Sequence, residues 1–590
     1  MSLLNQASLI QIPSGYKDGT LYSAKPINGD GDLDFTRSND TATRVNSAGL
    51  IEKVRTNLAL YSEQFTNAYW SKTATSITAN STTSPDGTIT ADTITADGTS
   101  SRHDAFLSLS ATSGTAYSYS VYVKKNTNDF FQIATGGGFG SNAFANFDLV
   151  NGVLGSIGSS ATATITNAGG GWYRCTITAT ATTTGTTGIY NLISTSSTAS
   201  RLEVNTLTTS IFIWGAQLEL SDFGATDYIP TTTTAVSVGM LANVPRVDYS
   251  GGGCGKLLLE PQRTNDLTFS EQFDNAGWSK LNATITANDI VSPDGYQNAD
   301  RITDNAFSTS HAVYRTGWDT TQRTASVYAK AGTSSKVYII NGATGTGVFA
   351  DLSTGTFIAN GTFTGTLTEV GNGWYRITAT HTAASAQTFA IGLFSGTSST
   401  VYVGTGSYAY IWGAQLEAGT YVTSYINTLS AVSTRGIDVM VVDDVYTNNL
   451  VTASGGTWYI EIDNNFVYTR DGANVGIYIA NDTSGGTSTD GLALRNNGAT
   501  ARLTINKRVA TIQTQLYVTT TDHVKVALKW NGTTLDVFQN GVKVVNATAF
   551  TPTIMEYFGS FGGDVPKYII ESLLFPTPLT DVECIELTTL

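Results

Sequence analysis

The sequence RTNLALYSEQF at residues 55–65 returns as RTNDLTFSEQF at residues 263–273. The same landmarks then follow both copies in the same order: WSK at 70–72 and 278–280, SPDG at 84–87 and 292–295, GWYR at 171–174 and 373–376, and IWGAQLE at 213–219 and 411–417. A unit of roughly 170 to 180 residues is too large for a solenoid repeat and has the size of an autonomous domain. The sequence therefore predicts two copies of one domain, over residues 55–236 (repeat 1) and 263–435 (repeat 2).

Strand-like alternation dominates both repeats. Apolar and polar residues alternate over YSYSVYVK at 117–124 and WYRCTIT at 172–178, and again over the matching segments at 323–330 and 374–380. A period of two residues with one buried face is typical of antiparallel sheets, and glycine-rich turn clusters separate these runs. The fold class we predict is all-β, with each repeat a jelly-roll-like sandwich of two sheets.

Composition and charge restrict the function. The chain has 590 residues, of which only 13% are charged, and a formal net charge of −14. Negative charge opposes binding to phosphate backbones, so we expect no nucleic-acid partner. No run approaches 18 apolar residues and the N-terminus lacks the pattern of a signal peptide, so we expect no membrane insertion and assembly in a cytoplasm.

Two segments, residues 1–54 and 237–262, stand outside the repeats. Both contain strand-like stretches: TRVNSAGLIEKV at 43–54, ANVPRVDYS at 242–250 and LLLEPQ at 257–262. We predict that the N-terminal segment is an attachment base, completed by the linker at 237–262, and that repeat 1 is inserted into this base. Such an insertion costs little when the ends of the inserted domain lie close together.

Residues 436–590 break from the repeat pattern. Asn-Gly pairs at 531–532 and 540–541 lie between alternating runs, which is a strong hairpin signal. The sequence LTDVE at 579–583 predicts a short terminal helix behind a Thr580 cap. A third β-sandwich is the expected structure here.

A family resemblance rests on these motifs. The strand–Asn-Gly–strand pattern and the LTDVE turn resemble the concanavalin-A-like, laminin-G-type lectin sandwich. The repeats, from WSK through SPDG and GWYR to WGAQLE, are similar to carbohydrate-binding-module-like domains of bacteriophage virion proteins, often labelled tail or head fibres. FTRS at 35–38, ATRV at 42–45 and LLLEPQRTN at 257–265 resemble the same proteins, so the resemblance spans nearly the whole chain.

The resemblance implies a virion surface fibre or receptor-binding protein. Such a protein would be a homotrimer on the virion surface, bound to other virion proteins through its N-terminal segment, attached to host surface glycans and without enzymatic activity. Two alternatives stay open: a purely structural decoration or spacer protein, and a tailspike-type enzyme that degrades its receptor polysaccharide. Hydrolysis of a polysaccharide needs two carboxylates across a cleft. Asp443 with Asp444 and Glu461 with Asp463 are the candidates, although adjacent acids in a strand point to opposite faces and a solvated strand face explains Glu461 and Asp463 equally well.

Aromatic residues are the candidates for sugar binding, because an aromatic ring can stack on the apolar side of a pyranose. Trp318 and Tyr314 have no aligned aromatic partner in repeat 1, which favours an exposed role in repeat 2. Trp70 and Trp278 are further candidates. Four tryptophans hold matched positions in alternating strands and are expected to be buried: Trp172, Trp374, Trp214 and Trp412.

Four aspartates recur at matched positions, Asp86 and Asp92 in repeat 1 and Asp294 and Asp300 in repeat 2. Carboxylates in loops are what calcium needs, so a structural calcium is one interpretation. An ordinary Pro-Asp-Gly turn is the other. The histidines at 103, 311, 381 and 523 fit no zinc spacing, and the three cysteines, Cys175, Cys254 and Cys584, are expected to be buried thiols.

Overall fold

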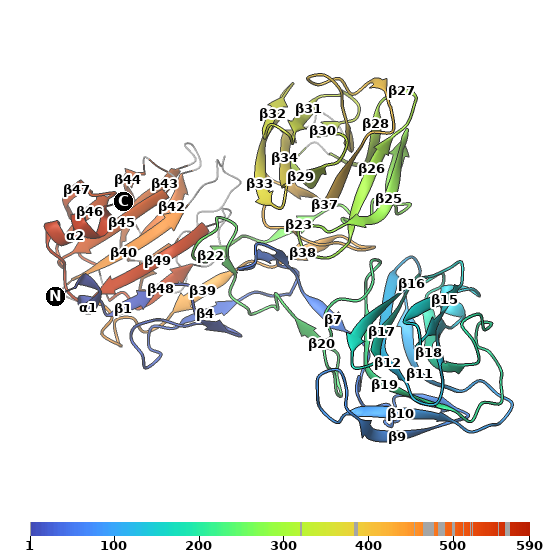
Figure 1. The fold of residues 1–590 in the computed structure, drawn as a ribbon. Coiled ribbons are helices and arrows are strands. Elements are labelled where there is room, and N and C mark those ends of the chain that lie inside the picture. Colours follow the sequence, from blue (N-terminus) through green and yellow to red (C-terminus); the bar gives the residue numbers. More distant parts are fainter. Residues whose placement is uncertain are drawn as a thin grey trace. The chain divides into compact units, whose positions relative to one another are not determined.

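The computed structural model describes residues 2–318, 321–382, 387–452, 455–463, 477–481, 490–497, 502–510, 512–519, 521, 523–552, 554–560 and 567–589. Almost all regular elements are β-strands (Figure 1), and the described residues include two α-helices, α1 (Leu3–Gln6) and α2 (Asp581–Thr588). The predicted all-β fold is confirmed. The chain forms two compact units, one of Val54–Gly239 with Tyr296–Asn298, the other of Met1–Lys53, Met240–Gly295 and Ala299–Leu590.

Repeat 1 is a sandwich of two six-stranded antiparallel sheets. The first sheet has the order β16-β17-β12-β19-β10-β9 and the second β15-β14-β13-β18-β11-β8. Their bounds are β8 (Ser71–Thr73), β9 (Thr75–Thr82), β10 (Ala91–Ala96), β11 (Asp104–Ala111), β12 (Ala116–Lys125), β13 (Phe130–Thr135), β14 (Phe144–Asp148), β15 (Val153–Ile157), β16 (Thr162–Gly169), β17 (Trp172–Thr180), β18 (Gly185–Ser194) and β19 (Ser210–Glu219). The alternation seen at 117–124 buries Tyr119, Val121 and Val123 between the sheets.

Repeat 2 has the same topology strand for strand. Its sheets have the orders β33-β34-β29-β37-β26-β25 and β32-β31-β30-β35-β28-β24. Their bounds are β24 (Ser279–Leu281), β25 (Ala283–Ile290), β26 (Ala299–Asp304), β28 (His311–Trp318), β29 (Gln322–Ala331), β30 (Lys336–Asn341), β31 (Gly347–Asp351), β32 (Thr356–Ala359), β33 (Thr364–Gly371), β34 (Trp374–Thr382), β35 (Gln387–Leu393) and β37 (Tyr408–Ala418). A short extra ladder joins β27 (Ser308–Thr309) to β36 (Tyr402–Val403).

Each repeat begins and ends in one two-stranded ladder, which explains the duplicated Arg-Thr-Asn. In repeat 1, β7 (Arg55–Asn57) pairs with β20 (Val236–Val238), and in repeat 2, β23 (Arg263–Asn265) pairs with β38 (Ser433–Arg435). The Asn57 amide donates to the carbonyls of Ala216 and Ile229. Asn265 makes the matching bonds to Ala414 and Ile426. The two ends of each repeat therefore lie side by side.

The third sandwich contains more of the chain than residues 436–590. One sheet has the order β21-β22-β49-β40-β45-β46-β47, with β1 also paired to β49, and the other has the order β2-β3-β4-β39-β48-β41-β42-β43-β44. Their bounds are β1 (Leu9–Gln11), β2 (Tyr16–Lys17), β3 (Thr20–Leu21), β4 (Leu33–Thr36), β21 (Val247–Asp248), β22 (Lys256–Leu259), β39 (Val439–Val442), β40 (Gly456–Asp463), β41 (Ile477–Ala480), β42 (Gly491–Asn497), β43 (Arg502–Val509), β44 (Ile512–Val518), β45 (His523–Trp530), β46 (Thr534–Gln539), β47 (Val542–Ala549), β48 (Tyr557–Ser560) and β49 (Lys567–Phe575).

The structure therefore corrects the prediction that the opening segment and the linker form a separate base. Strands of the opening segment and of the linker belong to the third sandwich, because their apolar residues share its core: Leu9, Phe35 and Leu257 pack with Trp458 and Ile460. Within this unit the opening and the linker do touch, since the Val45 N–H donates to Asp248. Both repeats are thus insertions into one sandwich.

The predictions for the terminal helix and the cysteines are confirmed in part. Thr580 and Glu583 form the predicted capping box at the start of α2. Cys175 and Cys584 are buried as expected, but Cys254 is exposed. Cys254 follows three glycines in the exposed turn between β21 and β22.

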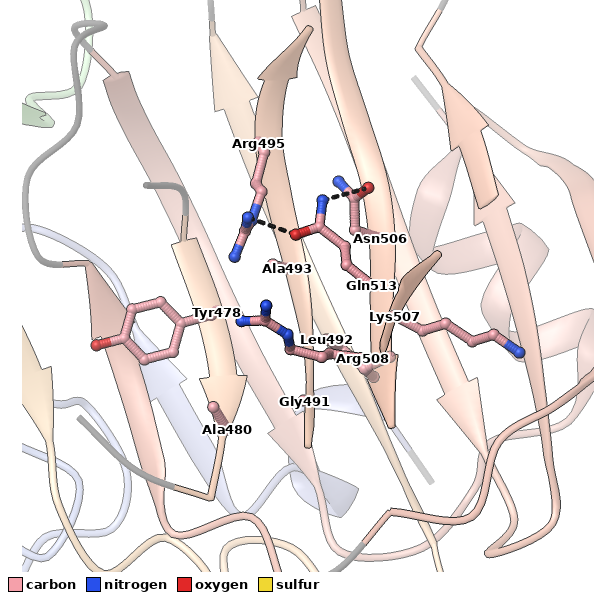
Figure 2. Close-up of a pocket in the computed structure, with 10 residues that line it drawn as sticks. All are labelled: Tyr478, Ala480, Gly491, Leu492, Ala493, Arg495, Asn506, Lys507, Arg508 and Gln513. Carbon is pink, nitrogen blue, oxygen red and sulfur yellow. Dashed lines mark hydrogen bonds between the residues drawn. The ribbon is translucent and has the colours of Figure 1, made fainter. Parts of the chain in front are cut away.

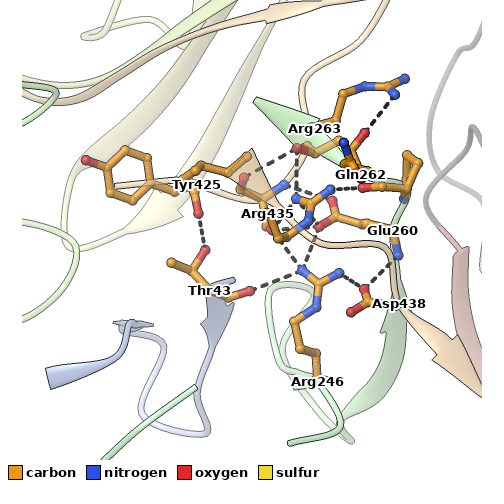
Figure 3. A network of polar contacts seen from close by, with 12 residues as sticks. Thr43, Arg246, Glu260, Gln262, Arg263, Tyr425, Arg435 and Asp438 are labelled. Carbon is orange, nitrogen blue, oxygen red and sulfur yellow. Dashed lines mark hydrogen bonds and ion pairs between the residues drawn. The ribbon is translucent and has the colours of Figure 1, made fainter. Parts of the chain in front are cut away.

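A buried ionic network joins three separate stretches of this unit (Figure 3). Arg246 and Glu260 come from the linker and pair at 2.6 Å, and Arg435 from β38 pairs with Glu260 at 2.8 Å. Asp438 binds both Arg246 and Arg37 of the opening segment. The five side chains are at most 3% exposed. Buried charges must be paired, so the network fixes which segments meet.

Fragments test the nested architecture. Residues 54–239 should fold alone, because their ends are already joined in one ladder and they hold a complete core. Residues 436–590 alone should stay unfolded or aggregate, because β1, β4 and β22 are missing from the sheets. Circular dichroism and thermal unfolding of both fragments check this. A cooperative transition from 436–590 alone would contradict the nested sandwich.

Arg246→Met tests the ionic network. The substitution leaves Glu260 and Asp438 with one cation fewer in a buried site, which should lower the free energy of unfolding by about 3–5 kcal/mol.

Burial by itself would raise the pKa of Glu260, but Arg435 and Arg246 outweigh it and lower the pKa to about 2. The stabilisation from Glu260 is therefore present above its unfolded pKa of roughly 4.3 and is lost as the pH falls toward 2. Urea titrations across this range should show that loss in the parent and a flatter profile in Glu260→Gln.

Candidate functional site

The structure encloses the tryptophans that were candidates for sugar binding. Trp70 and Trp278 are each 1% exposed. Their indole N–H groups donate to the carbonyls of Tyr61 and Phe269 at 3.0 and 2.9 Å. A ring with no open face cannot stack on a sugar, so the prediction that these two bind glycan is wrong. The four tryptophans expected to be buried, Trp172, Trp374, Trp214 and Trp412, are at most 3% exposed.

Tyr314 also differs from the prediction. It lies opposite Ser279 in the β24–β28 ladder, as Phe106 lies opposite Ser71 in the β8–β11 ladder. Tyr314 therefore has an aromatic counterpart in repeat 1, and it is half-buried against an apolar cluster that includes Tyr338. The side chain of Trp318 lies outside the described residues.

The four aspartates predicted as calcium ligands already bind other groups of the protein. Asp92 accepts the N–H groups of Phe65 and Asn80 at 2.9 and 3.0 Å. Asp300 accepts those of Phe273 and Asn288 at 2.8 and 2.9 Å. Asp86 accepts from Ser84 and Thr88 within its own turn, and Asp294 pairs with Lys53. Among the described residues no group of three His, Cys, Asp or Glu side chains could hold a metal. A calcium held by these aspartates with loop carbonyls stays a prediction.

The candidate catalytic carboxylates are engaged or solvated. Glu461 binds His523 at 2.7 Å, and Asp463 forms an ion pair with Lys256. Asp443 and Asp444 are exposed in the turn after β39. Such ion pairs are the ordinary role of charges on a strand face.

The outer face of the nine-stranded sheet carries a hollow (Figure 2). Alternation along β41 and β42 sends Ile477, Ile479, Leu492 and Leu494 into the core. The residues between them face outward, and three of these are small: Ala480, Gly491 and Ala493. Small residues flanked by Tyr478, Arg495 and Arg508 leave a narrow hollow with room for about one water molecule.

Planar polar groups line the hollow in a chain. Arg495 Nη1 donates to Gln513 Oε1 at 2.7 Å, and Gln513 Nε2 lies 3.5 Å from Asn506 Oδ1. Asn506 is held in turn by the Thr504 hydroxyl at 2.9 Å. Burial, and then the neighbouring Arg508, lower the pKa of Arg495. Two guanidinium groups, two amides and a phenol ring therefore share one concave surface.

Sequence reasoning missed these five residues. Their signal was present: in LALRNN at 492–497 and LTINKRV at 503–509, polar residues alternate with leucine and isoleucine. A core strand that is exposed on its other face gives the same alternation, so only the structure separates a solvated face from a hollow.

A second outward face distinguishes the two repeats. On the β11–β18 ladder of repeat 1, the rings of Phe106 and Tyr190 lie 4.9 Å apart. The Arg102 guanidinium lies 4.8 Å from the Tyr190 ring and its Nε pairs with Asp104 at 2.8 Å. In repeat 2 the matching strand positions hold Tyr314, Ala390, Ser310 and Ala312. At these four positions, repeat 1 combines rings with charged groups and repeat 2 does not.

Comparisons with known proteins give weak likenesses. No family model matches the chain, and no curated protein matches it. Domain 4 of AbnA, a GH43 extracellular arabinanase from Geobacillus stearothermophilus in complex with arabinotriose, aligns at 14% identity over 26% of this chain and 73% of its own, with a TM-score of 0.21. The N-terminal CBM22-1-CBM22-2 tandem domain of Xyn10C from Paenibacillus barcinonensis aligns at 12% identity over 62% and 98%, also with a TM-score of 0.21. TM-scores this low carry no argument about fold or ligand.

The structure also bears on the membrane prediction. Neither helix in the described ranges has the length and apolar character needed to cross a bilayer.

Asp104 gives repeat 1 a specific pH dependence. Burial raises the pKa of Asp104 to about 6, against the lowering effect of Arg102. The folded state therefore holds this proton more tightly than the unfolded state, so its stabilisation is complete below roughly pH 4 and is lost as the pH rises through about 6. Asp104→Asn should remove that loss, which is about 2–3 kcal/mol from the size of the shift. Urea unfolding of residues 54–239 at pH 4 and pH 8 checks it, with Asp129→Asn in the same repeat as the control; parallel pH profiles for parent and Asp104→Asn would contradict it.

Proposed function

We propose that this chain is a glycan-binding protein without catalytic activity, and that it acts as a surface fibre or receptor-binding protein of a bacteriophage virion. The single observation that carries glycan binding is the hollow on the nine-stranded sheet. The fibre assignment, the homotrimer and the location on the virion surface are supported by the sequence resemblance alone.

The hollow suits a sugar for chemical reasons. Hydroxyl groups of a sugar both donate and accept, and the guanidinium of Arg495 and the amides of Gln513 and Asn506 offer fixed donors and acceptors. Tyr478 is 1% exposed, so the contacts with a sugar would come from Gln513 and Arg508, which are at least partly exposed at the rim. The mutual hydrogen bonds hold the polar groups in place before the ligand arrives, which reduces the entropy cost of binding.

The residues that line the hollow fit binding better than catalysis. A glycosidase needs two carboxylates on either side of the scissile bond, and the described residues that line the hollow include no carboxylate. A weak lectin site gains useful affinity when several copies act together, so the proposed trimer would raise avidity.

A glycan array of bacterial surface polysaccharides tests the proposal. The intact protein should bind selectively, and Gln513→Ala combined with Arg508→Met should weaken binding by about tenfold or more, since each removes hydrogen bonds to the ligand. Both side chains are at least partly exposed, so the fold should survive. Thr514→Ala is the matched control, because Thr514 is exposed on the same strand but does not line the hollow.

Other outcomes separate the alternatives. Selective binding that the double substitution does not weaken would place the site elsewhere, with the Arg102, Phe106 and Tyr190 face of repeat 1 next to be tested. If an intact oligomer binds no glycan on the array, a spacer or decoration protein is favoured. Release of reducing ends from a bound polysaccharide would revive the tailspike enzyme. Light scattering of the same sample measures the oligomeric state.

A further inference from the structure

A short segment of the chain docks on the outer face of repeat 2. It comprises residues 50–53, which include β6 (Ile51–Glu52), a strand paired with β5 (Arg44–Val45). Lys53 Nζ lies between two carboxylates, 2.7 Å from Glu271 Oε1 and 3.0 Å from Asp294 Oδ2. The Ile51 N–H donates to the Pro293 carbonyl at 2.9 Å. The segment is thus held by one ammonium group and one backbone hydrogen bond.

An apolar wall completes this docking surface. Ile51 is 7% exposed and packs with Trp374, Trp412 and Tyr425. The Tyr425 hydroxyl lies 3.0 Å from Glu271 Oε1, and Ser270 holds that hydroxyl at 2.7 Å. Apolar burial and charge pairing therefore act on neighbouring residues of the same segment.

Repeat 1 has the same surface, residue for residue. The matching residues are Ser62, Glu63, Pro85, Asp86, Gly87, Trp172, Trp214 and Tyr228. The Tyr228 hydroxyl lies 3.0 Å from Glu63 Oε1, and Ser62 holds that hydroxyl at 2.8 Å. Trp214 and Tyr228 have ring centroids 4.7 Å apart, as do Trp412 and Tyr425. The wall and the two carboxylates are thus already in position.

In repeat 1 the charged side of this surface is open, although Trp172 and Trp214 behind it are each 3% exposed. Asp86 and Gly87 are exposed, whereas Asp294 is buried. A Cβ atom added to Gly295 would lie 2.9 Å from Leu50, but one added to Gly87 would meet nothing within 4 Å. Asp86 uses Oδ1 for its own turn, and in the described part of the chain no ion pair reaches Oδ2, the atom that matches the one bound by Lys53. Burial raises the pKa of Glu63, and the neighbouring Asp86 adds to that effect.

We infer that repeat 1 binds a lysine-bearing extended segment of a second polypeptide, in the way that repeat 2 binds residues 50–53. Two carboxylates favour a cation, and the partly exposed Tyr228 ring favours an apolar residue two positions before the lysine. The carbonyl of Pro85 offers the backbone acceptor that Pro293 provides in repeat 2. The chain's own Lys53 is already bound, so the occupant comes from another chain.

Peptide binding to the intact protein tests this inference. The probe is a fluorescein-labelled peptide with the sequence of residues 48–54, AGLIEKV, measured by fluorescence anisotropy. The parent protein should bind it, and Glu63→Gln combined with Asp86→Asn should weaken binding by about tenfold or more. A peptide with norleucine in place of lysine should lose binding to the same degree. Asp97→Asn combined with Asp129→Asn removes the same charge elsewhere in repeat 1 and should leave binding unchanged.

Three results would overturn the inference. The first is no binding by the parent, and the second is equal binding by the Glu63→Gln, Asp86→Asn protein with an unchanged melting temperature. The third is displacement of the peptide by calcium chloride or by acetyl-lysine amide as effectively as by unlabelled peptide, which would make the surface a simple cation site. Because the hollow is untouched, glycan binding by the double variant separates this inference from the proposed function.

Discussion

The pairing of β49 with three distant segments is the constraint on which the rest of the structure depends. Its neighbours are β40 on one side and β1 and β22 along the other. The sandwich can close only when residues from both ends of the chain and from its middle are present together, which is a high-contact-order arrangement. The buried network around Glu260 selects the correct segments, because a mismatched segment would leave a charge buried without a partner.

The nested arrangement explains how one sandwich carries two domains. Each repeat leaves and re-enters the chain through a single ladder, so the interrupted sandwich needs only two neighbouring attachment points for each insertion. The duplicated Arg-Thr-Asn motif is therefore a structural requirement. Asn57 and Asn265 fix the ladder by donating to two carbonyls of their own repeat, a role that no apolar residue could fill.

Much of this fold could be predicted from alternation and duplication, and much of the site could not. Period-two patterns at 117–124 and 172–178 and the Asn-Gly turns were local signals, and they predicted the sandwiches. The sharing of β1, β4 and β22 with the terminal sandwich depends on pairings across hundreds of residues, which no local pattern encodes. Aromatic identity misled for a physical reason: a tryptophan gains more from full burial than any other side chain here, so Trp70 and Trp278 lie inside. The hollow depends on small residues that lie beside large ones from neighbouring strands, and the sequence alone does not show which strands are neighbours.

The duplication itself is the best guide to function. Residues that both copies retain, such as the aspartates at 92 and 300, hold the same backbone groups in both and belong to the scaffold. Other residues, such as Arg102 and Ser310 on the outer faces, differ between the copies while the scaffold stays the same. The docking surface combines the two cases: its residues are retained, yet Lys53 fills it in one copy and no described residue of the chain fills it in the other. Hydrogen bonds within the turn explain why both copies keep this aspartate, since Ser84 donates to Asp86 as Ser292 donates to Asp294. The cation that we infer from outside the chain would bind the other oxygen of Asp86 together with Glu63.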